Sequence, residues 1–230
     1  KKKIAIIQPN YIPWIGYFKI IKNVDEFIFL DDVQYTKRDW RNRNFINSTK
    51  GKIMLSIPIL TKNRYFQKIC DAECLNDKWK KDHLTKIKDS YKDYPNFDEI
   101  FDILNKSYYK SNSKNLITNL YNILFEIMKF LKIKTKISFS KDIKSDKKKL
   151  DKLIDICKYK KANVYLSGPS ASSYIDEKKI NQNDLSLEYM HYDKYIYKVH
   201  NKNHNFIDNL SIIDLLMNEG KNSYRFFKKS

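Results

Sequence analysis

KIAIIQPNYIPWIGYFKIIKNVDEFIFLDD, residues 3–32, is the stretch of sequence that decides the fold. Residues 3–8 form a short apolar run, and residues 16–22 carry the start of a helix. A second apolar run at residues 25–30 follows and ends at an acidic pair. This order of strand, turn, helix and strand is typical of a βαβ unit, whose parallel strands end at the same edge of a sheet.

The rest of the chain moves from helical patterns back to alternating strands and helices. Residues 52–60 alternate as a third strand, and Pro58 favours an edge or strand-end position there. Helical patterns at 77–93, 97–108 and 113–133 then predict a helical subdomain, residues 76–133, inserted in a single α/β domain of residues 1–230. The later elements are expected as strands at 137–139, 163–166 and 185–190, and as helices at 146–160, from Ala171, and at 211–218 with Gly220 as the stop. The sequence therefore predicts an α/β fold with a Rossmann-like parallel sheet core and a ligand crevice at the strand ends.

The composition favours a folded chain without a specific nucleic-acid target. With 230 residues, of which 42% are hydrophobic and 14% aromatic, the chain can bury one core and is not a disordered tail. The net charge of +18 comes nearly all from scattered lysines. Scattered charge attracts anions without specificity. We therefore expect no specific nucleic-acid binding, although the charge can help an anionic substrate reach the site.

Cysteine usage and hydropathy predict a soluble, cytoplasmic protein. The cysteines are Cys70, Cys74 and Cys157, an odd number that is typical of reduced thiols rather than a disulfide frame. The spacing of Cys70 and Cys74 is wider than in a zinc knuckle, and no Cys/His pair accompanies it, so no metal site is expected. No stretch approaches the ~20 apolar residues of a transmembrane segment. Residues 1–7 run directly into a strand pattern rather than a signal peptide.

Arginine is rare in this lysine-rich chain and is concentrated in one segment. Arg38, Arg41 and Arg43 lie within six positions, and only Arg64 and Arg225 lie elsewhere. Lysine would serve an ordinary solvated face as well. Arginine is needed where a planar fork holds a phosphate or carboxylate with two hydrogen bonds. The segment therefore predicts a site for an anionic group.

Strand-end turns carry small and acidic residues that suit a ligand. The turn SGPS at residues 167–170 offers backbone N–H groups and hydroxyls to an anion, but it lacks the Gly-x-Ser-x-Gly spacing of a nucleophile elbow. Gly16 and Gly168 lie in such turns, where a positive φ or the close approach of a ligand would require glycine. Asp31 and Asp32 end a predicted strand and suit a general base or a metal ligand, or alternatively a turn cap.

Aromatic residues accompany these loops. They are Tyr11, Trp14, Tyr17, Tyr35 and Trp40. Such side chains suit stacking on a base or sugar, although tyrosine is so common in this chain that each also fits ordinary packing. Trp79 precedes His83 by four residues on a predicted helix, which places both on one face. A lone histidine on a helix also fits a core or surface position.

Several blocks of the sequence resemble the WbqC-like protein family. Residues 4–18, IAIIQPNYIPWIGYF, and residues 29–44, FLDDVQYTKRDWRNRN, resemble its signature. Trp79 with His83, YLSGPSA at residues 165–171 and LSIIDLLMNEG at residues 210–220 are similar to its later blocks. The resemblance covers nearly the whole chain, and the second block is long and unusual enough to be highly specific.

The resemblance implies a role in building bacterial surface glycans. Members tend to be encoded among genes for O-antigen, capsule or flagellar glycan synthesis. The usual suggestion is transfer to a nucleotide-linked or lipid-linked sugar. The resemblance also implies that His83 has a function.

A weaker likeness concerns the opening of nucleotidylyl-transferases and pantothenate synthetases. There a strand is followed by a His-x-Gly-His motif that holds nucleotide phosphates, and the corresponding segment here is WIGY at residues 14–17. Trp14 and Tyr17 replace both histidines, so imidazoles cannot stabilise a phosphate at this place and arginines would have to substitute. The likeness is a hint of the fold only.

The leading hypothesis from sequence is a transferase that modifies an activated sugar, by acyl or aminoacyl transfer to an amino sugar. Asp32 or His83 is expected to deprotonate the attacking group, Arg38, Arg41 and Arg43 to hold phosphates, and residues 167–170 to orient the acceptor. With the segments 8–17, 31–44 and 167–174 as the expected site, the other predicted substrate-binding residues are Gln8, Tyr11, Trp14, Gly16, Tyr17, Asp31, Gln34, Tyr35, Lys37, Trp40, Ser167, Gly168 and Ser170.

The substrate is expected to be a small phosphorylated or nucleotide-linked molecule, and the sequence identifies no cofactor and no oligomeric state. Two alternatives stay open. One is a nucleotidylyl-transferase or adenylate-forming enzyme, which predicts Mg²⁺ dependence and pyrophosphate release. The other is a non-catalytic binding protein of the glycan assembly machinery.

Overall fold

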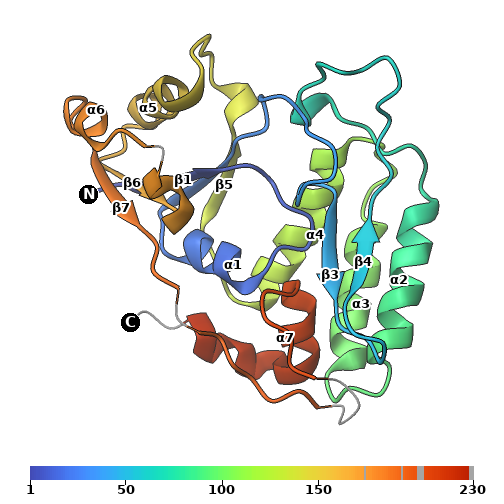
Figure 1. Cartoon of the computed structure of the whole chain (residues 1–230). Helices are drawn as coiled ribbons and strands as arrows, with labels where there is room; N and C mark the ends of the chain where they lie inside the picture. Colours follow the sequence, from blue (N-terminus) through green and yellow to red (C-terminus); the bar gives the residue numbers. More distant parts are fainter. Residues whose placement is uncertain (174, 193, 201–204, 228–230) are drawn as a thin grey trace. The chain divides into compact units, whose positions relative to one another are not determined.

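The structure is a computed structural model that describes residues 1–173, 175–192, 194–200 and 205–227 (Figure 1). Its contacts divide the chain into two compact units, each of which is described by itself. Unit 1 comprises Lys1–Pro9, Gly16–Asp32 and Lys134–Asp193. Unit 2 comprises Asn10–Ile15, Val33–Ile133 and Lys194–Ser230. Whether the chain is one domain, as the sequence predicts, stays a prediction.

Unit 1 is built on a parallel β-sheet. Its strands are β1 (Lys3–Ile7), β2 (Glu26–Phe29), β5 (Lys136–Phe139), β6 (Val164–Ser167) and β7 (Ser186–Tyr189). They lie in the order β5-β2-β1-β6-β7, and every neighbouring pair is parallel. In the register of β1 and β2, Ile6 is opposite Ile28. The predicted α/β class with a Rossmann-like parallel sheet is confirmed.

Helices cover both faces of this sheet because its strands are apolar on both sides. On one face, Ile4, Ile6 and Ile28 pack with α5 (Lys149–Tyr159) and α6 (Glu177–Asn181), which contribute residues such as Ile154 and Ile180. On the other face, Phe27 meets Tyr17 of α1 (Ile15–Lys22), with ring centroids 5.2 Å apart. Successive side chains of a strand point to opposite faces, so the alternation in β1 and β2 builds both layers.

The order of the strands in unit 1 reverses direction at one point. From β1 the chain moves outward on one side to β2 and then β5, and returns to the other side of β1 for β6 and β7. The switch therefore lies between β1 and β6. Sheets wound in this way bind their ligands outside the carboxyl ends of the two strands at the switch.

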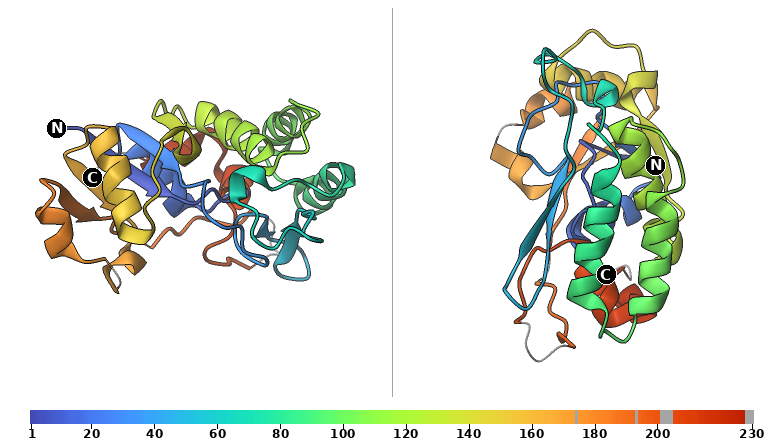
Figure 2. Two further views of the ribbon diagram at one scale, coloured as in Figure 1. Left: turned by 90° about the horizontal axis from the view of Figure 1, so that it is seen from above. Right: turned by 90° about the vertical axis from the view of Figure 1, so that its right-hand side faces the viewer.

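Unit 2 combines a short hairpin with a group of helices. Strands β3 (Arg43–Ile46) and β4 (Ile53–Ser56) pair antiparallel. The helices are α2 (Lys78–Tyr91), α3 (Phe97–Tyr108), α4 (Leu116–Phe130) and α7 (Ile212–Glu219). Helices α2, α3 and α4 lie side by side (Figure 2). The side chain of Asn115 caps α4 by accepting a hydrogen bond from the Thr118 N–H, 3.0 Å away.

Buried polar groups tie the elements of unit 2 together. Asp214 of α7 is fully buried and accepts hydrogen bonds from the hydroxyls of Tyr91, at 2.8 Å, and Tyr197, at 2.6 Å. The Tyr91 hydroxyl also accepts a hydrogen bond from the Asn47 N–H at 2.9 Å. A buried carboxylate is costly unless such partners satisfy it. Asp214 therefore links α2, α7 and the segment after β3.

One sequence expectation is confirmed in part and one is wrong. The strand expected at residues 52–60 is present as β4, which pairs with β3 in a separate two-stranded sheet, and Pro58 follows its end. The helix expected from Ala171 is a short 3-10 segment (Pro169–Ser173), and the next α-helix is α6. Ser172 and Ser173 hydrogen-bond through their hydroxyls to the carbonyls of Pro169 and Ser170, which competes with regular helix formation.

Other predicted elements agree with the structure. The bounds of α3 are those predicted, and α7 ends at Glu219, directly before Gly220, which has a φ of +49°. Within the described ranges, no helix combines the length and the apolar character that a membrane crossing requires.

Candidate functional site

The switch point of unit 1 brings together two predicted binding segments. Gln8 follows the carboxyl end of β1, and Gly168 and Ser170 follow the carboxyl end of β6. Ser167 is the last residue of β6 and is buried, whereas Ser170 is exposed. The segments after β1 and β6, which are far apart in the chain, thus lie at the same edge of the sheet, as expected from parallel strands.

The backbone conformation at residue 168 does not require glycine. Its φ is not positive, so the expectation that Gly16 or Gly168 supplies a left-handed turn is wrong. A Cβ added at Gly168 would meet no described atom within 4 Å. The space that a side chain at position 168 would occupy is therefore open. The other reason expected for glycine, the close approach of a ligand to the backbone, stays a prediction. Gly16 is buried within α1.

An acidic cluster lies where β2 and β5 end. Asp31 is fully buried, and its Oδ1 accepts hydrogen bonds from the Lys141 N–H at 2.9 Å and the Ser140 hydroxyl at 3.1 Å. Its Oδ2 is buried without a partner among the described residues. Burial raises the pKa of Asp31, and the two hydrogen bonds moderate the rise.

Asp32 has a different environment from Asp31. Its carboxylate accepts a hydrogen bond from the Ser140 hydroxyl and forms an ion pair with Lys152 of α5. The Asp32 side chain keeps 10% of its surface exposed. The single proton of Ser140 can serve only one of the two carboxylates at a time, so Ser140 couples Asp31 and Asp32. A partly exposed carboxylate such as Asp32, placed beside a buried one such as Asp31, is an arrangement suited to proton transfer.

Sequence reasoning found the two acids but missed their partners. Ser140, Lys141 and Lys152 lie more than a hundred residues later in the chain. A single serine or lysine does not stand out as a candidate site residue in a sequence so rich in lysine. The pairing of β5 with β2 brings Ser140 and Lys141 to the acids, and Lys152 reaches Asp32 from α5.

Tyr17 lies in the core of unit 1. It is 3% exposed, packs on Phe27 and donates a hydrogen bond to the Gln8 carbonyl at 3.0 Å. That bond fixes the turn after β1. Tyr17 therefore positions Gln8, and its predicted contact with substrate stays a prediction.

His83 lies in unit 2 at the centre of a buried hydrogen-bond chain. Its Nε2 is 3.2 Å from the Ser56 carbonyl, and its Nδ1 is 2.7 Å from the Tyr11 hydroxyl. Because a carbonyl can only accept, Nε2 carries the proton and Nδ1 accepts from Tyr11. The Tyr11 hydroxyl in turn contacts the Tyr108 hydroxyl. Trp79 packs against His83 with ring centroids 5.4 Å apart, as their helical spacing predicts.

This environment keeps His83 neutral. Burial lowers the pKa of His83 to about 4. The ring is 1% exposed, and both of its nitrogens are already engaged. The geometry favours a structural role for His83 and Tyr11, and the catalytic role predicted for His83 stays a prediction.

The arginines of the predicted cluster lie in different environments. Arg41 is buried and forms an ion pair with Asp39. Burial opposes the ionisation of Asp39, but its bonds to Arg41, the Trp40 N–H and Thr36 outweigh that effect and lower its pKa. Arg38 is exposed, with a φ of +59°. Holding of phosphates by these arginines stays a prediction, and the fork of Arg41 already has a carboxylate.

Tyr35 is held close to the same cluster. It is 6% exposed, and burial raises its pKa to about 12, although Arg41 and Arg43 oppose that rise. The Nε atoms of both arginines are buried without a hydrogen-bond partner among the described residues. Trp40 is 49% exposed and meets the edge of Phe45 at 6.1 Å between ring centroids.

Unit 2 also contains a cavity of about 300 Å³. Its lining residues are Gln34, Tyr35, Thr36, Lys37, Thr61, Arg64, Tyr65 and Gln67. Sequence reasoning had selected Gln34, Tyr35 and Lys37. It missed the wall formed by residues 61–67, although Arg64 was already visible as a rare arginine.

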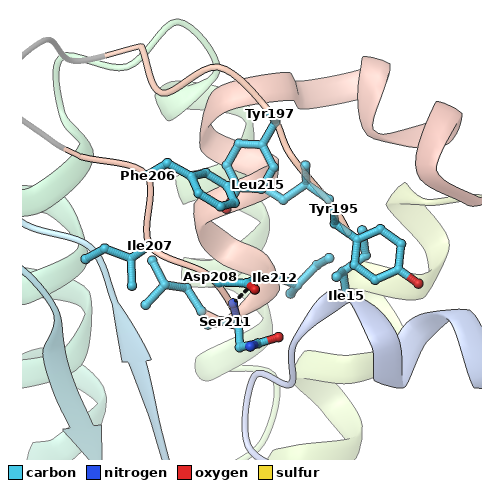
Figure 3. Close-up of a pocket in the computed structure, with 11 residues that line it drawn as sticks. Ile15, Tyr195, Tyr197, Phe206, Ile207, Asp208, Ser211, Ile212 and Leu215 are labelled. Carbon is cyan, nitrogen blue, oxygen red and sulfur yellow. Dashed lines mark hydrogen bonds between the residues drawn. The ribbon is translucent and has the colours of Figure 1, made fainter. Parts of the chain in front are cut away.

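A second pocket in unit 2 is too small for a substrate. It lies beside α7 under Tyr195, Tyr197 and Phe206 (Figure 3). Its volume of about 20 Å³ suits roughly one water molecule. Trp14 is half-buried near this region, with its ring centroid 6.3 Å from that of Tyr195. Trp14 therefore packs against an aromatic neighbour in unit 2.

No metal centre is evident in the described part of the chain. Within it, no three His, Cys, Asp or Glu side chains lie close enough together to hold an ion. Cys70, Cys74 and Cys157 are not linked by disulfide bonds, and burial raises the pKa of Cys74 and of Cys157 to about 12. Tyr174, at the end of one predicted site segment, lies outside the described residues.

Comparison with known proteins identifies a family and a relative of this chain. The model of the WbqC-like protein family matches residues 8–226. Uncharacterized protein Rv1507c of Mycobacterium tuberculosis is 39% identical over 220 residues, which are 95% of this chain and 94% of that protein. No solved structure matches. The resemblance seen in the sequence blocks is confirmed.

Proposed function

The chain belongs to the WbqC-like protein family, and from this premise we propose that it is a transferase of bacterial surface-glycan biosynthesis. The proposed reaction is transfer of an acyl or aminoacyl group to the amine of an activated amino sugar. Expectations about the family, rather than its curated relative, suggest the pathway. The observation that carries the proposal is the constellation at the strand ends of unit 1.

The switch point between β1 and β6 supports binding of the acceptor there. Gly168 has an open side, and Ser170 next to it is exposed. A sugar presents many hydroxyl groups, and backbone amides with serine hydroxyls are suitable partners for them. Gln8 is held from the β1 side by its carbonyl contact with Tyr17. In the proposal, these groups orient the amino sugar.

Asp32 is the proposed general base. The amine nitrogen attacks the carbonyl carbon of an acyl thioester, the new C–N bond forms, and the C–S bond breaks. Asp32 takes the proton lost by the amine, and the thiolate leaves and is protonated by solvent. Lys152 and Ser140 fix the Asp32 carboxylate, and Asp31 lies buried behind it on the same hydroxyl. His83 has no free nitrogen in its present contacts, so the proposal gives the base to Asp32.

The test is a product measurement with a matched pair of variants. Purified protein is incubated with a nucleotide-linked amino sugar and a panel of acyl thioesters, and the sugar is examined by mass spectrometry for the added acyl mass. Asp32→Asn should lower the rate by about 10²- to 10⁴-fold, the usual contribution of a general base. Asp146→Asn, an exposed acid of unit 1, should leave the rate unchanged.

Two results would contradict the proposal. One is an unchanged rate in Asp32→Asn when the transfer is present in the wild-type protein. The other is release of pyrophosphate from ATP or CTP without any acyl transfer, which would establish nucleotidylyl transfer instead. Thermal unfolding of both variants shows whether loss of rate reflects loss of the fold.

A further inference from the structure

The cavity in unit 2 is built by two segments that are joined through their backbones. The Tyr35 N–H donates to the Gln67 carbonyl at 2.9 Å, and the Ile69 N–H donates to the Val33 carbonyl at 2.9 Å. The Gln34 side chain donates to the Tyr65 carbonyl at 3.1 Å. These bonds hold residues 34–37 against residues 61–67, so the cavity is formed before any ligand arrives. Ligand sites in proteins are usually preformed in this way.

The charge of the cavity suits an anion. Lys37 and Arg64 line it, and the described lining residues include no acid. The described part of the chain offers Lys37 no carboxylate within ion-pair distance. Arg64 pairs with Glu73 at 3.1 Å, with 39% and 42% of the two side chains exposed. An exposed pair of this kind contributes little, so a phosphate can replace the carboxylate at small cost.

Aromatic side chains at the cavity suit a planar ring. Tyr65 lines the cavity and is 76% exposed, and Phe66 beside it is 82% exposed. Their rings meet edge to face at 4.9 Å between centroids. Large aromatic groups left in water are a feature of binding surfaces, and a stacked base would cover the Tyr65 ring. Tyr35 stays a neutral phenol, because burial raises its pKa to about 12.

The side chain of Gln67 adds to the cavity an oxygen acceptor that receives no hydrogen bond from the described residues. Its Nε2 donates to the Leu60 carbonyl at 2.9 Å. Because that carbonyl can only accept, the other atom of the amide is the oxygen. This Oε1 is buried and lacks a partner among the described residues. An unsatisfied buried acceptor is costly, and an N–H group of a ligand, such as the imide N–H of uracil, would remove that cost after a small rotation of the amide.

We propose that this cavity binds a nucleoside diphosphate. The base packs against Tyr65 and offers an N–H to Gln67, and the phosphates contact Lys37 and Arg64. The volume of about 300 Å³ is at the lower end of ligand sites, which suits one nucleotide rather than a dinucleotide. The inference concerns unit 2 alone and is independent of the transfer reaction proposed for unit 1.

Calorimetric titration of the full chain with UDP tests the proposal. UDP should bind, and Lys37→Ala and Arg64→Ala should each weaken its binding by about tenfold. Lys62→Ala removes an exposed lysine from the same loop that does not line the cavity, and it should change the affinity less than twofold. Tyr65→Ala should weaken binding by about fivefold or more, and Tyr65→Phe, which keeps the ring, should restore it.

The controls separate a nucleotide site from a general anion effect. Pyrophosphate and uridine alone should each bind more weakly than UDP. Pyrophosphate that binds as tightly as UDP would overturn the proposal, as would UDP affinity that is equal in the wild-type, Lys37→Ala and Arg64→Ala proteins. Failure here leaves the Asp32 assay untouched, and UDP binding together with pyrophosphate release and no acyl transfer would support this inference while contradicting the proposed function.

Discussion

Single buried polar residues explain much of what holds unit 2 together. His83 joins Tyr11 to the Ser56 carbonyl, and both of its ring nitrogens are used. Burial of this arrangement favours the neutral ring. The cost of protonating His83 is therefore part of the stability of the folded protein.

His83 should make the protein less stable in mild acid. In the unfolded chain the imidazole has its ordinary pKa of 6.5, and in the folded protein its pKa is about 4. Between these values the unfolded state binds more protons, so stability is full above pH 6.5 and is lost as the pH falls toward 4. From pH 7 to pH 5, the wild-type protein should lose about 2 kcal/mol more than His83→Gln. Urea unfolding at both pH values measures the difference, and equal losses would contradict it.

The spacing of residues in the sequence predicted contacts better than it predicted roles. Trp79 and His83 lie on one helical face and touch, as expected. The sequence could not show that Tyr11, more than seventy positions earlier, would occupy the His83 nitrogen. A histidine engaged within a core and a histidine facing a substrate give the same local pattern, because the difference depends on tertiary contacts.

At the scale of elements, strand ends and helix stops were predictable and pairing partners were not. The apolar runs that became β1, β2 and β6 are visible in the sequence, and the acids follow β2 as expected. Strand β3 is short, begins with the polar residues Arg43 and Asn44, and pairs with β4 several residues later. Four residues are too few for a clear alternating pattern, so the pairing of β3 with β4 is seen only in the structure.

The end of α7 provides a test of backbone geometry. Gly220 has a φ of +49°, and a Cβ there would meet the Asn96 Oδ1 at 2.1 Å. Asn96 donates hydrogen bonds to the carbonyls of Met217 and Asn218, which end α7. Gly220→Ala should therefore lower the free energy of unfolding by about 1–3 kcal/mol, through strain and loss of this cap.

Gly168→Ala is the matched control for that experiment. Its φ is not positive and the space beside it is open, so its free energy of unfolding should stay within about 0.5 kcal/mol of the wild-type value or rise slightly. Chemical denaturation of both variants measures the contrast. Equal destabilisation of the two variants would show that the geometry of Gly220 is not what the structure describes.

For the whole molecule, the sequence predicted the α/β class and the parallel sheet but not the order of its strands. The position of β5 beside β2 places Ser140 on Asp31 and Asp32, and no local pattern encodes that pairing. The switch point between β1 and β6 depends on the later return of the chain from β5 to β6, which no local pattern encodes either. The candidate site was therefore predicted as separate segments, and the structure supplies the partners that couple the acids.

The net charge of +18 should make the stability of the whole chain depend on salt. Like charges repel each other more in the compact state than in the unfolded chain, and salt screens that repulsion. The melting temperature should rise when NaCl is increased from about 20 mM to 500 mM, where the screening length falls from roughly 20 Å to roughly 4 Å. The rise should be smaller in Lys81→Glu, which lowers the net charge at an exposed position. A fall in the melting temperature with salt would contradict this view.

The most direct test of the central claim is amide hydrogen exchange with and without a nucleotide-linked amino sugar at saturating concentration. The account predicts slower exchange in residues 168–171, where the turn after β6 meets the switch point of the sheet. Unchanged exchange in this turn, with protection confined to other segments of a protein shown to bind the ligand, would contradict it.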